Sequence, residues 1–236
     1  MPALELVVAH HTENLNWLRN LPNGLQLSVY NKSAEDETDW DVIPLPNVGR
    51  EAHTYLHHIV NRYDSLADCT IFCQGKPFDH AYDFKKTIRD FVAHSPAIDE
   101  LKPETGFRWL GHLIDTDDDQ GHRLFRPWSK NEDGRGLDLR EFHRTLFGND
   151  GPEQYTFVLG AQFAVHRTVL HRRSVEFYKQ ALAVSMTFPD AAHCFERSWD
   201  RVFDVVGIDP EWLNERLTVR LKPMKNQLSG DTPTVQ

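Results

Sequence analysis

The sequence predicts a single α/β domain with a mostly parallel central sheet flanked by helices. Short apolar segments, each the length of a buried strand, alternate with segments whose apolar residues have helical spacing. The chain has 236 residues, of which 40% are hydrophobic and 26% charged, so it is long enough to bury one large core. We expect the domain to span residues 1–224, followed by a polar, disordered tail at 225–236.

The alternation is clearest in the first half of the chain. Residues 49–63 form the best predicted helix, with Ala52, Leu56, Ile59 and Val60 at helical spacing. A second helix is expected at 83–94. The expected strands are residues 4–9, 25–30, 40–45 and 68–73. Sites in such sheets lie beyond the carboxyl ends of the strands, which is where we look for function.

The second half has a weaker pattern. We expect irregular structure from residue 96 to 152 and a strand-like segment from 155 to 166, around Gly160. Two long helices are predicted after it, at 168–185 and 193–206.

Composition excludes some classes of function. The formal net charge of −9 and the absence of a basic patch argue against a nucleic-acid partner. No apolar segment has the roughly 18 residues needed for a membrane span, and the N-terminus lacks the pattern of a signal peptide. Cys69, Cys73 and Cys194 cannot all pair, and none lies in a CxxC motif, so we expect reduced thiols in a cytoplasmic protein.

Two groups of residues invite a metal interpretation. His53 and His57 are four residues apart and share a helix face, but a third ligand of defined spacing is missing. The acidic run DTDDDQG, residues 115–121, has the oxygen ligands of a divalent-cation site. It lies in a polar, irregular stretch, which favours a solvated acidic loop.

The start of the best helix is a candidate anion site. Asn47, Gly49 and Arg50 stand where a helix N-terminus has free backbone N–H groups and partial positive charge. The guanidinium of Arg50 adds a planar donor fork for a phosphate or a carboxylate. The alternative is a helix capped by Asn47, with Arg50 paired to a neighbouring acid.

Glu196 is a candidate general base. It lies beside an apolar stripe of Phe195, Trp199, Val202 and Phe203 on the last predicted helix. A carboxylate at the edge of an apolar face is partly desolvated, which predicts a raised pKa and a role in proton transfer. A salt bridge to Arg197 or Arg201 is the alternative.

Several segments, spanning about residues 4–206, resemble a family of bacterial and fungal proteins catalogued as a domain of unknown function and similar to the glycosyltransferase A superfamily. They include NVGREAHTYLHHI, FCQGKPFDH, GAQFAVHR and FERSW. The resemblance implies a single glycosyltransferase-A-like, Rossmann-like domain. Its implied ligands are a nucleotide-sugar donor and a small-molecule or glycan acceptor.

The resemblance also implies roles for particular residues. Those near the donor would be Ala9, Glu13, Asn47, Gly49, Arg50, Gln74, Gly75 and Lys76. On the acceptor side, Gln162 would lie on a strand, and Glu196 would orient or deprotonate the acceptor hydroxyl.

One motif departs from the family's pattern. The strand ending at Cys73 should deliver an Asp-x-Asp that binds Mn²⁺ or Mg²⁺, but Gln74 and Gly75 follow it. Either the enzyme is metal-independent and uses Arg50, Lys76 and His80 for phosphate charge, or Asp79 and His80 rebuild a metal site. A further alternative is a metal-assisted hydrolase or a non-catalytic ligand-binding protein on the same scaffold.

Overall fold

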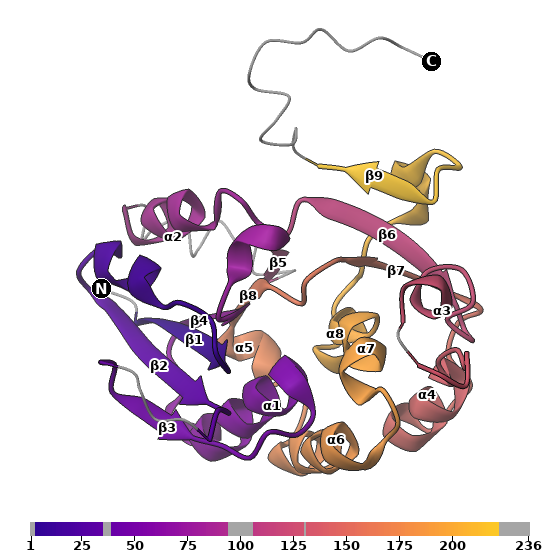
Figure 1. Ribbon diagram of the computed structural model, residues 1–236, viewed down its shortest axis with the longest axis horizontal. Coiled ribbons are helices and arrows are strands. Elements are labelled where there is room, and N and C mark those ends of the chain that lie inside the picture. Colours follow the sequence, from indigo (N-terminus) through magenta and orange to yellow (C-terminus); the bar gives the residue numbers. More distant parts are fainter. Residues whose placement is uncertain (1–2, 35–38, 94–105, 130, 222–236) are drawn as a thin grey trace, which may run out of the picture.

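The computed structural model describes residues 3–34, 39–93, 106–129 and 131–221. Its main sheet has six strands in the order β3-β2-β1-β4-β8-β5 (Figure 1). The strands are β1 (Leu4–His10), β2 (Leu25–Asn31), β3 (Val42–Pro44), β4 (Cys69–Gln74), β5 (Phe107–Trp109) and β8 (Phe163–His166). The first four strands run parallel, and β8 is antiparallel to both β4 and β5. The predicted α/β class with a mostly parallel sheet is confirmed.

Both faces of this sheet are covered, which explains why β1 is apolar from Leu6 to Ala9. Val7 and Ala9 point into the larger core, with helix α1 (Arg50–Arg62). Leu6 and Val8 point into a second core on the other face, with helix α2 (Phe84–Ala93). Side chains alternate between the faces of a strand, so a strand covered on both sides has no polar face.

A second, three-stranded antiparallel sheet lies beside the first in the order β7-β6-β9. Its strands are β6 (Leu113–Asp118), β7 (Gln154–Val158) and β9 (Thr218–Arg220), and helices α3 (Phe125–Trp128) and α4 (Leu139–Phe147) accompany it. The prediction of irregular structure across residues 96–152 is therefore wrong for much of that range. The acidic run begins inside β6, where Asp115 and Asp117 are buried, so the prediction of a solvated loop is also wrong.

Gly160 divides the segment predicted as one strand. Gly160 and Ala161 have φ values of 99° and 49°, and this turn sends β7 and β8 into different sheets. The left-handed region is strained for Ala161 but open to glycine.

Both long helices predicted in the second half are divided. The first becomes α5 (Arg167–Leu170) and α6 (Val175–Thr187), because the Ser174 side chain caps α6 at Phe177 N. The second becomes α7 (Ala191–Glu196) and α8 (Trp199–Val202). Short 3₁₀ turns complete the fold at Asn16–Asn20, Tyr63–Ser65, Pro77–Asp79 and Pro210–Leu213.

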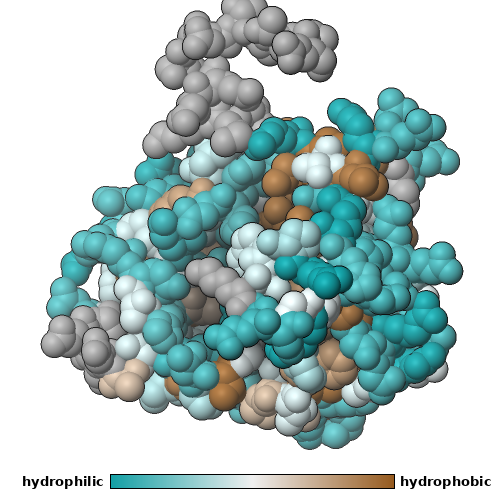
Figure 2. All heavy atoms as spheres, turned by 45° about the vertical axis from the view of Figure 1, so that its right-hand side comes forward, coloured by the Kyte–Doolittle hydropathy of each residue, from teal (hydrophilic) through white to brown (hydrophobic). Residues whose placement is uncertain are grey.

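The surface and the termini add three facts. Figure 2 shows a largely hydrophilic face, with a group of hydrophobic side chains near its top and smaller ones along its lower part. Within the described ranges, no helix is long and apolar enough to cross a membrane, and all three cysteines are free and buried. The tail predicted at 225–236 lies outside the described residues.

Candidate functional site

A cleft opens at the carboxyl ends of β1, β2 and β4. Chain connections from β1 lead to β2 and β3 on one side, and then return through α1 to β4 on the other side. In open α/β sheets, ligands bind outside the carboxyl ends of the strands at this kind of reversal. The cleft encloses about 260 Å³ and is lined by Ala9, His10, His11, Glu13, Lys32, Asn47, Arg50, Glu51 and Gln74.

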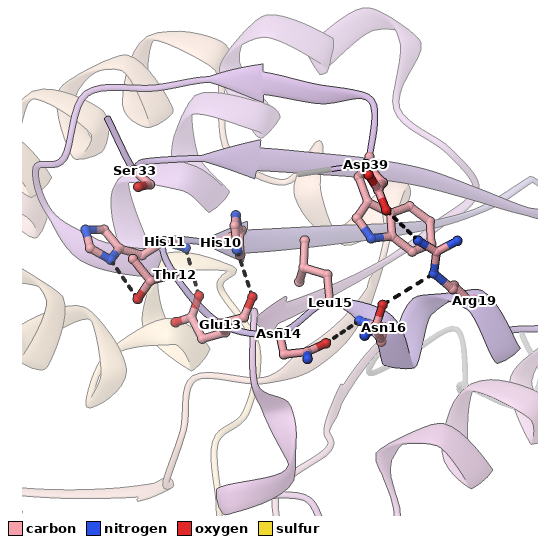
Figure 3. Close-up of a pocket in the computed structure, with 11 residues that line it drawn as sticks. His10, His11, Thr12, Glu13, Asn14, Leu15, Asn16, Arg19, Ser33 and Asp39 are labelled. Atoms are coloured by element: carbon pink, nitrogen blue, oxygen red, sulfur yellow. Dashed lines mark hydrogen bonds and ion pairs between the residues drawn. The ribbon is translucent and has the colours of Figure 1, made fainter. Parts of the chain in front are cut away.

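The loop after β1 forms one wall of the cleft and folds around Glu13. His11 N donates to the Glu13 carboxylate at 2.8 Å, and His10 Nε2 lies 3.0 Å from the Glu13 carbonyl oxygen. Figure 3 shows these side chains together with an adjoining hollow. In that hollow Arg19 pairs with Asp39 at 3.0 Å and lies over the Trp40 ring.

The start of α1 forms the opposite wall, and its backbone is unusual. Gly49 and Arg50 have φ values of 58° and 47°, and no side chain caps the helix. Asn47 does not act as the predicted cap, because its amide lies 3.2 Å from His11 Nε2 instead. The first turn of α1 therefore lies at the cleft without a capping side chain from Gly49, beside Arg50, whose side chain is 57% exposed.

Lys32 holds this strained helix start in place. Its ammonium donates to the carbonyl oxygens of Val48 and Arg50 and lies 3.2 Å from His53 Nδ1. Burial lowers the pKa of Lys32 to about 8, partly offset by the nearby Glu51 carboxylate. All three ammonium hydrogens are thus engaged, so Lys32 positions the wall rather than offering a free donor.

Arg50 links the cleft to α7. Its Nη1 lies 3.1 Å from His193 Nε2, and His193 Nδ1 lies 3.9 Å from Glu196 Oε2. Arg50 Nε also lies 3.7 Å from the Glu51 carboxylate, which burial gives a raised pKa. Arg50, Glu51, His193 and Glu196 form one group of ionisable side chains, which we call the cleft-edge cluster.

Glu196 does not have the predicted raised pKa. Burial does raise the pKa, but His193, the positive charge of Arg197 and the Gly160 N–H outweigh it and bring it to about 2. Gly160 N donates to Glu196 Oε1 at 2.7 Å, and Arg197 Nη1 lies 3.7 Å from Oε2. The predicted salt bridge to Arg197 is present, and Glu196 is a firmly ionised carboxylate. Neither Glu196 nor His193 lines the cleft; His193 meets it through its contact with Arg50.

The loop from Gln74 to His80 contributes to the cleft mainly through Gln74. Gly75 is packed into the backbone, with its N–H donating to the Ala9 carbonyl at 2.8 Å. Lys76 and Asp79 form an ion pair of 3.1 Å in which both side chains are about 60% exposed. These two lie outside the lining of the cleft.

Gln162 and His80 lie close to the turn that carries Gly160. Gln162 is fully buried, and its Nε2 donates to the Pro77 carbonyl at 3.0 Å. A side chain at Gly160 would collide with the His80 ring. His80 therefore packs on the same turn whose N–H holds Glu196.

The two candidate metal groups have other partners. Asp117 accepts from Leu124 N, Phe125 N and the Arg197 guanidinium, and Asp115 pairs with Arg123. The rings of His53 and His57 lie 6.0 Å apart. Across the described part of the chain, no three His, Cys, Asp or Glu side chains gather as ligands for a metal ion.

Sequence reasoning missed five residues of the site. His10 and His11 lie at the end of a buried strand, between Ala9 and Glu13. The strand end that predicted those two residues therefore also predicts the two histidines. Lys32, Glu51 and His193 join the site only through tertiary contacts. Spacing along the chain gives no signal for them.

Comparison with known families places this chain in one of them. The family model described as "Protein of unknown function (DUF3431)" matches residues 6–211. The chain belongs to this family. No curated protein matches the sequence. The family match begins within β1 and ends within η5 (Pro210–Leu213), and it includes every residue that lines the cleft.

Proposed function

We propose that this protein is a glycosyltransferase, which binds a nucleotide-sugar donor in the cleft and transfers its sugar to an acceptor hydroxyl. The observation that carries the proposal is the uncapped start of α1 with Arg50, at the reversal point of the parallel sheet. A nucleotide sugar has a diphosphate, and diphosphates suit helix N-termini and guanidinium groups.

The backbone at Arg50 supports a binding role. A residue other than glycine at φ 47° is strained by roughly 1–3 kcal/mol, and such strain persists where the surrounding structure enforces it. Here Lys32 enforces it by bonding the carbonyl of Arg50 itself. We infer that the strain holds the guanidinium and the free N–H groups on the same side of the cleft.

The remaining donor contacts come from the β1 and β4 ends in this proposal. Ala9, Glu13, Gln74 and Gly75 surround the point where the two strands meet, and Lys76 adds a cation whose exposed ion pair with Asp79 opens at little cost. Gln162 and Glu196 belong to the acceptor side. Metal-independent transfer, with Arg50, Lys76 and His80 offsetting phosphate charge, is one form of the proposal; Mn²⁺ or Mg²⁺ held through Asp79 and His80 is the other.

Ligand binding tests the proposal directly. We expect a panel of uridine, guanosine and thymidine diphosphate sugars to include one that raises the Tm, measured with and without Mn²⁺. Calorimetry with that compound should show that Arg50→Ala loses roughly 1.5–3 kcal/mol of binding free energy, about 10–150-fold in Kd.

Arg89→Ala is the matched control, because Arg89 is an exposed arginine on α2, away from the cleft. It should bind like the native protein. A panel in which no compound binds, or an Arg50→Ala variant with native affinity, would contradict the proposal.

A further inference from the structure

We propose that His193 is the residue that accepts the proton from the acceptor hydroxyl, and that Glu196 positions it. This inference rests on the proposed function and revises the sequence-based assignment of Glu196 as the base. It starts from the geometry of the cleft-edge cluster, in which His193 lies between Arg50 and Glu196.

The neighbours of His193 determine its tautomer. A guanidinium has only donors, so His193 Nε2, 3.1 Å from Arg50 Nη1, must present a lone pair. The ring hydrogen then sits on Nδ1, which faces the Glu196 carboxylate at 3.9 Å. In this tautomer the lone pair of Nε2 points toward Arg50, the residue that lines the cleft. A base oriented by a carboxylate is the arrangement that proton-transfer sites share, and such contacts are often long before substrate binds.

Two groups besides His193 hold Glu196 in place. Its carboxylate accepts from Gly160 N at 2.7 Å and lies 3.7 Å from Arg197 Nη1. Arg197 also donates to the His193 carbonyl at 2.9 Å and pairs with buried Asp117 at 2.8 Å. A chain of contacts thus runs from β6 to the imidazole. A carboxylate this firmly ionised stabilises an imidazolium better than it removes a proton.

Aromatic rings enclose the other side of the imidazole. Phe125 and Trp128 lie with ring centroids 5.0 and 5.4 Å from that of His193. Trp128 is 65% exposed, so its ring forms an open wall beside the proposed base. The C–H face of a sugar ring packs well on such a wall, which favours a carbohydrate acceptor.

The proposed step balances as follows. The acceptor oxygen forms a bond to the anomeric carbon of the donor while its proton passes to His193 Nε2. The bond from that carbon to the phosphate oxygen breaks, and the nucleoside diphosphate leaves with the electron pair. Arg50 is shared between His193 and the diphosphate, so donor binding draws the guanidinium away and frees Nε2. The imidazolium formed is then stabilised by Glu196.

The test measures nucleoside diphosphate release from the donor found by thermal shift, with water and with p-nitrophenyl glycosides as acceptors. His193→Gln should lower kcat by about 10²–10⁴-fold while donor Kd stays native. The native rate should fall at acid pH as the imidazole is protonated, and His193→Gln should lose this acid limb. Glu196→Gln should keep the limb and move it to lower pH, because the imidazolium loses a neighbouring negative charge.

His122→Gln is the matched control, because His122 Nδ1 also lies 3.9 Å from a carboxylate, that of Asp118, outside the cleft. It should leave the rate and the pH profile native. Native-like release by His193→Gln, an acid limb that survives in it, or donor binding with no release to any acceptor would each overturn the inference while donor binding stands. Failure of the native protein to bind any donor would overturn the proposed function as well.

Discussion

Asp117 and Asp79 are both acidic residues that the sequence offered as metal ligands, and the fold uses them in opposite ways. Asp117 is buried in β6, where it accepts three backbone N–H groups and two bonds from the Arg197 guanidinium, both to Oδ2. Asp79 is about 60% exposed at the end of β4's loop and pairs only with Lys76 among its described contacts. The acid expected in a solvated loop is enclosed, and the acid expected at the site is open.

Whether a carboxylate is buried, rather than how many acids a segment contains, decides whether that carboxylate can bind a ligand. An enclosed carboxylate with every lone pair engaged fixes its neighbours, and here it fixes the arginine behind Glu196. An exposed pair in water exchanges partners at little cost, so it remains available to a ligand.

Asp117→Asn should give the largest effect. It leaves the Arg197 guanidinium buried without its counter-charge, which typically costs about 3–5 kcal/mol. Chemical denaturation should show this loss of unfolding free energy. Asp133→Asn, at an acid that pairs with Arg135 in an exposed loop, should leave the unfolding midpoint nearly unchanged. Equal stabilities for the two variants would contradict the contrast between enclosed and exposed acids.

Acid pH should reveal a second enclosed group, around His58. His58 is fully buried, with Tyr30 Oη 3.0 Å from Nδ1 and Glu5 3.6 Å from Nε2. Burial, together with the nearby Arg62 and His57, lowers the pKa of His58 to about 3. Burial, with the charges of Lys32 and His57, also lowers the pKa of His53, to about 4.

The sign of the pH effect follows from these directions. Below the ordinary histidine pKa of about 6.5 the unfolded chain binds protons that the folded chain excludes, so stability is full above pH 6.5 and is lost as the pH falls toward 4. We expect a loss of roughly 2–4 kcal/mol over this window, measured by denaturation at each pH. His58→Gln does not titrate and should flatten the dependence. A native stability that rises on acidification would contradict the prediction.

The same contrast explains how much the sequence predicted. The parallel strands and α1 were predictable because β1 and β4 are covered on both faces, which leaves a continuous apolar signal. Asp117 was not, because its carboxylate is stabilised by Arg197, 80 residues away along the chain. Part of the cleft lining could be predicted, because it lies at strand ends and at a helix start: Ala9, Asn47, Arg50 and Gln74. His193 meets Arg50 only through folding.

Gly49→Ala should lower the unfolding free energy by an intermediate amount. It tests whether the contrast between buried and exposed positions also holds for the backbone. Gly49 has a φ of 58°, and a side chain there would collide with the Ser185 carbonyl of α6. Strain and collision together should cost about 2–3 kcal/mol, on the scale of left-handed strain plus overpacking. Gly134→Ala is the control, since Gly134 has a φ of 62° but nothing near its Cβ position. It should lose only about 1 kcal/mol in denaturation. If both variants lose the same unfolding free energy, the predicted collision with α6 at Gly49 is wrong.

Lys76→Ala should have the smallest effect on stability. Because Lys76 and Asp79 are about 60% exposed, water replaces each partner readily, and removing the pair should change the unfolding free energy by less than about 1 kcal/mol. The proposed function nonetheless predicts weaker nucleotide-sugar binding in this variant. In the native protein the Lys76 ammonium, which follows Gln74 after the end of β4, would leave Asp79 and contact the donor. Calorimetry and denaturation on the same variant separate the two results. Asp79→Asn should behave differently: it removes the competing acid and leaves Lys76 in place, so affinity should hold or rise. A large loss of stability in Lys76→Ala would show that the exposed pair acts as an enclosed one, and unchanged affinity would remove Lys76 from the donor site.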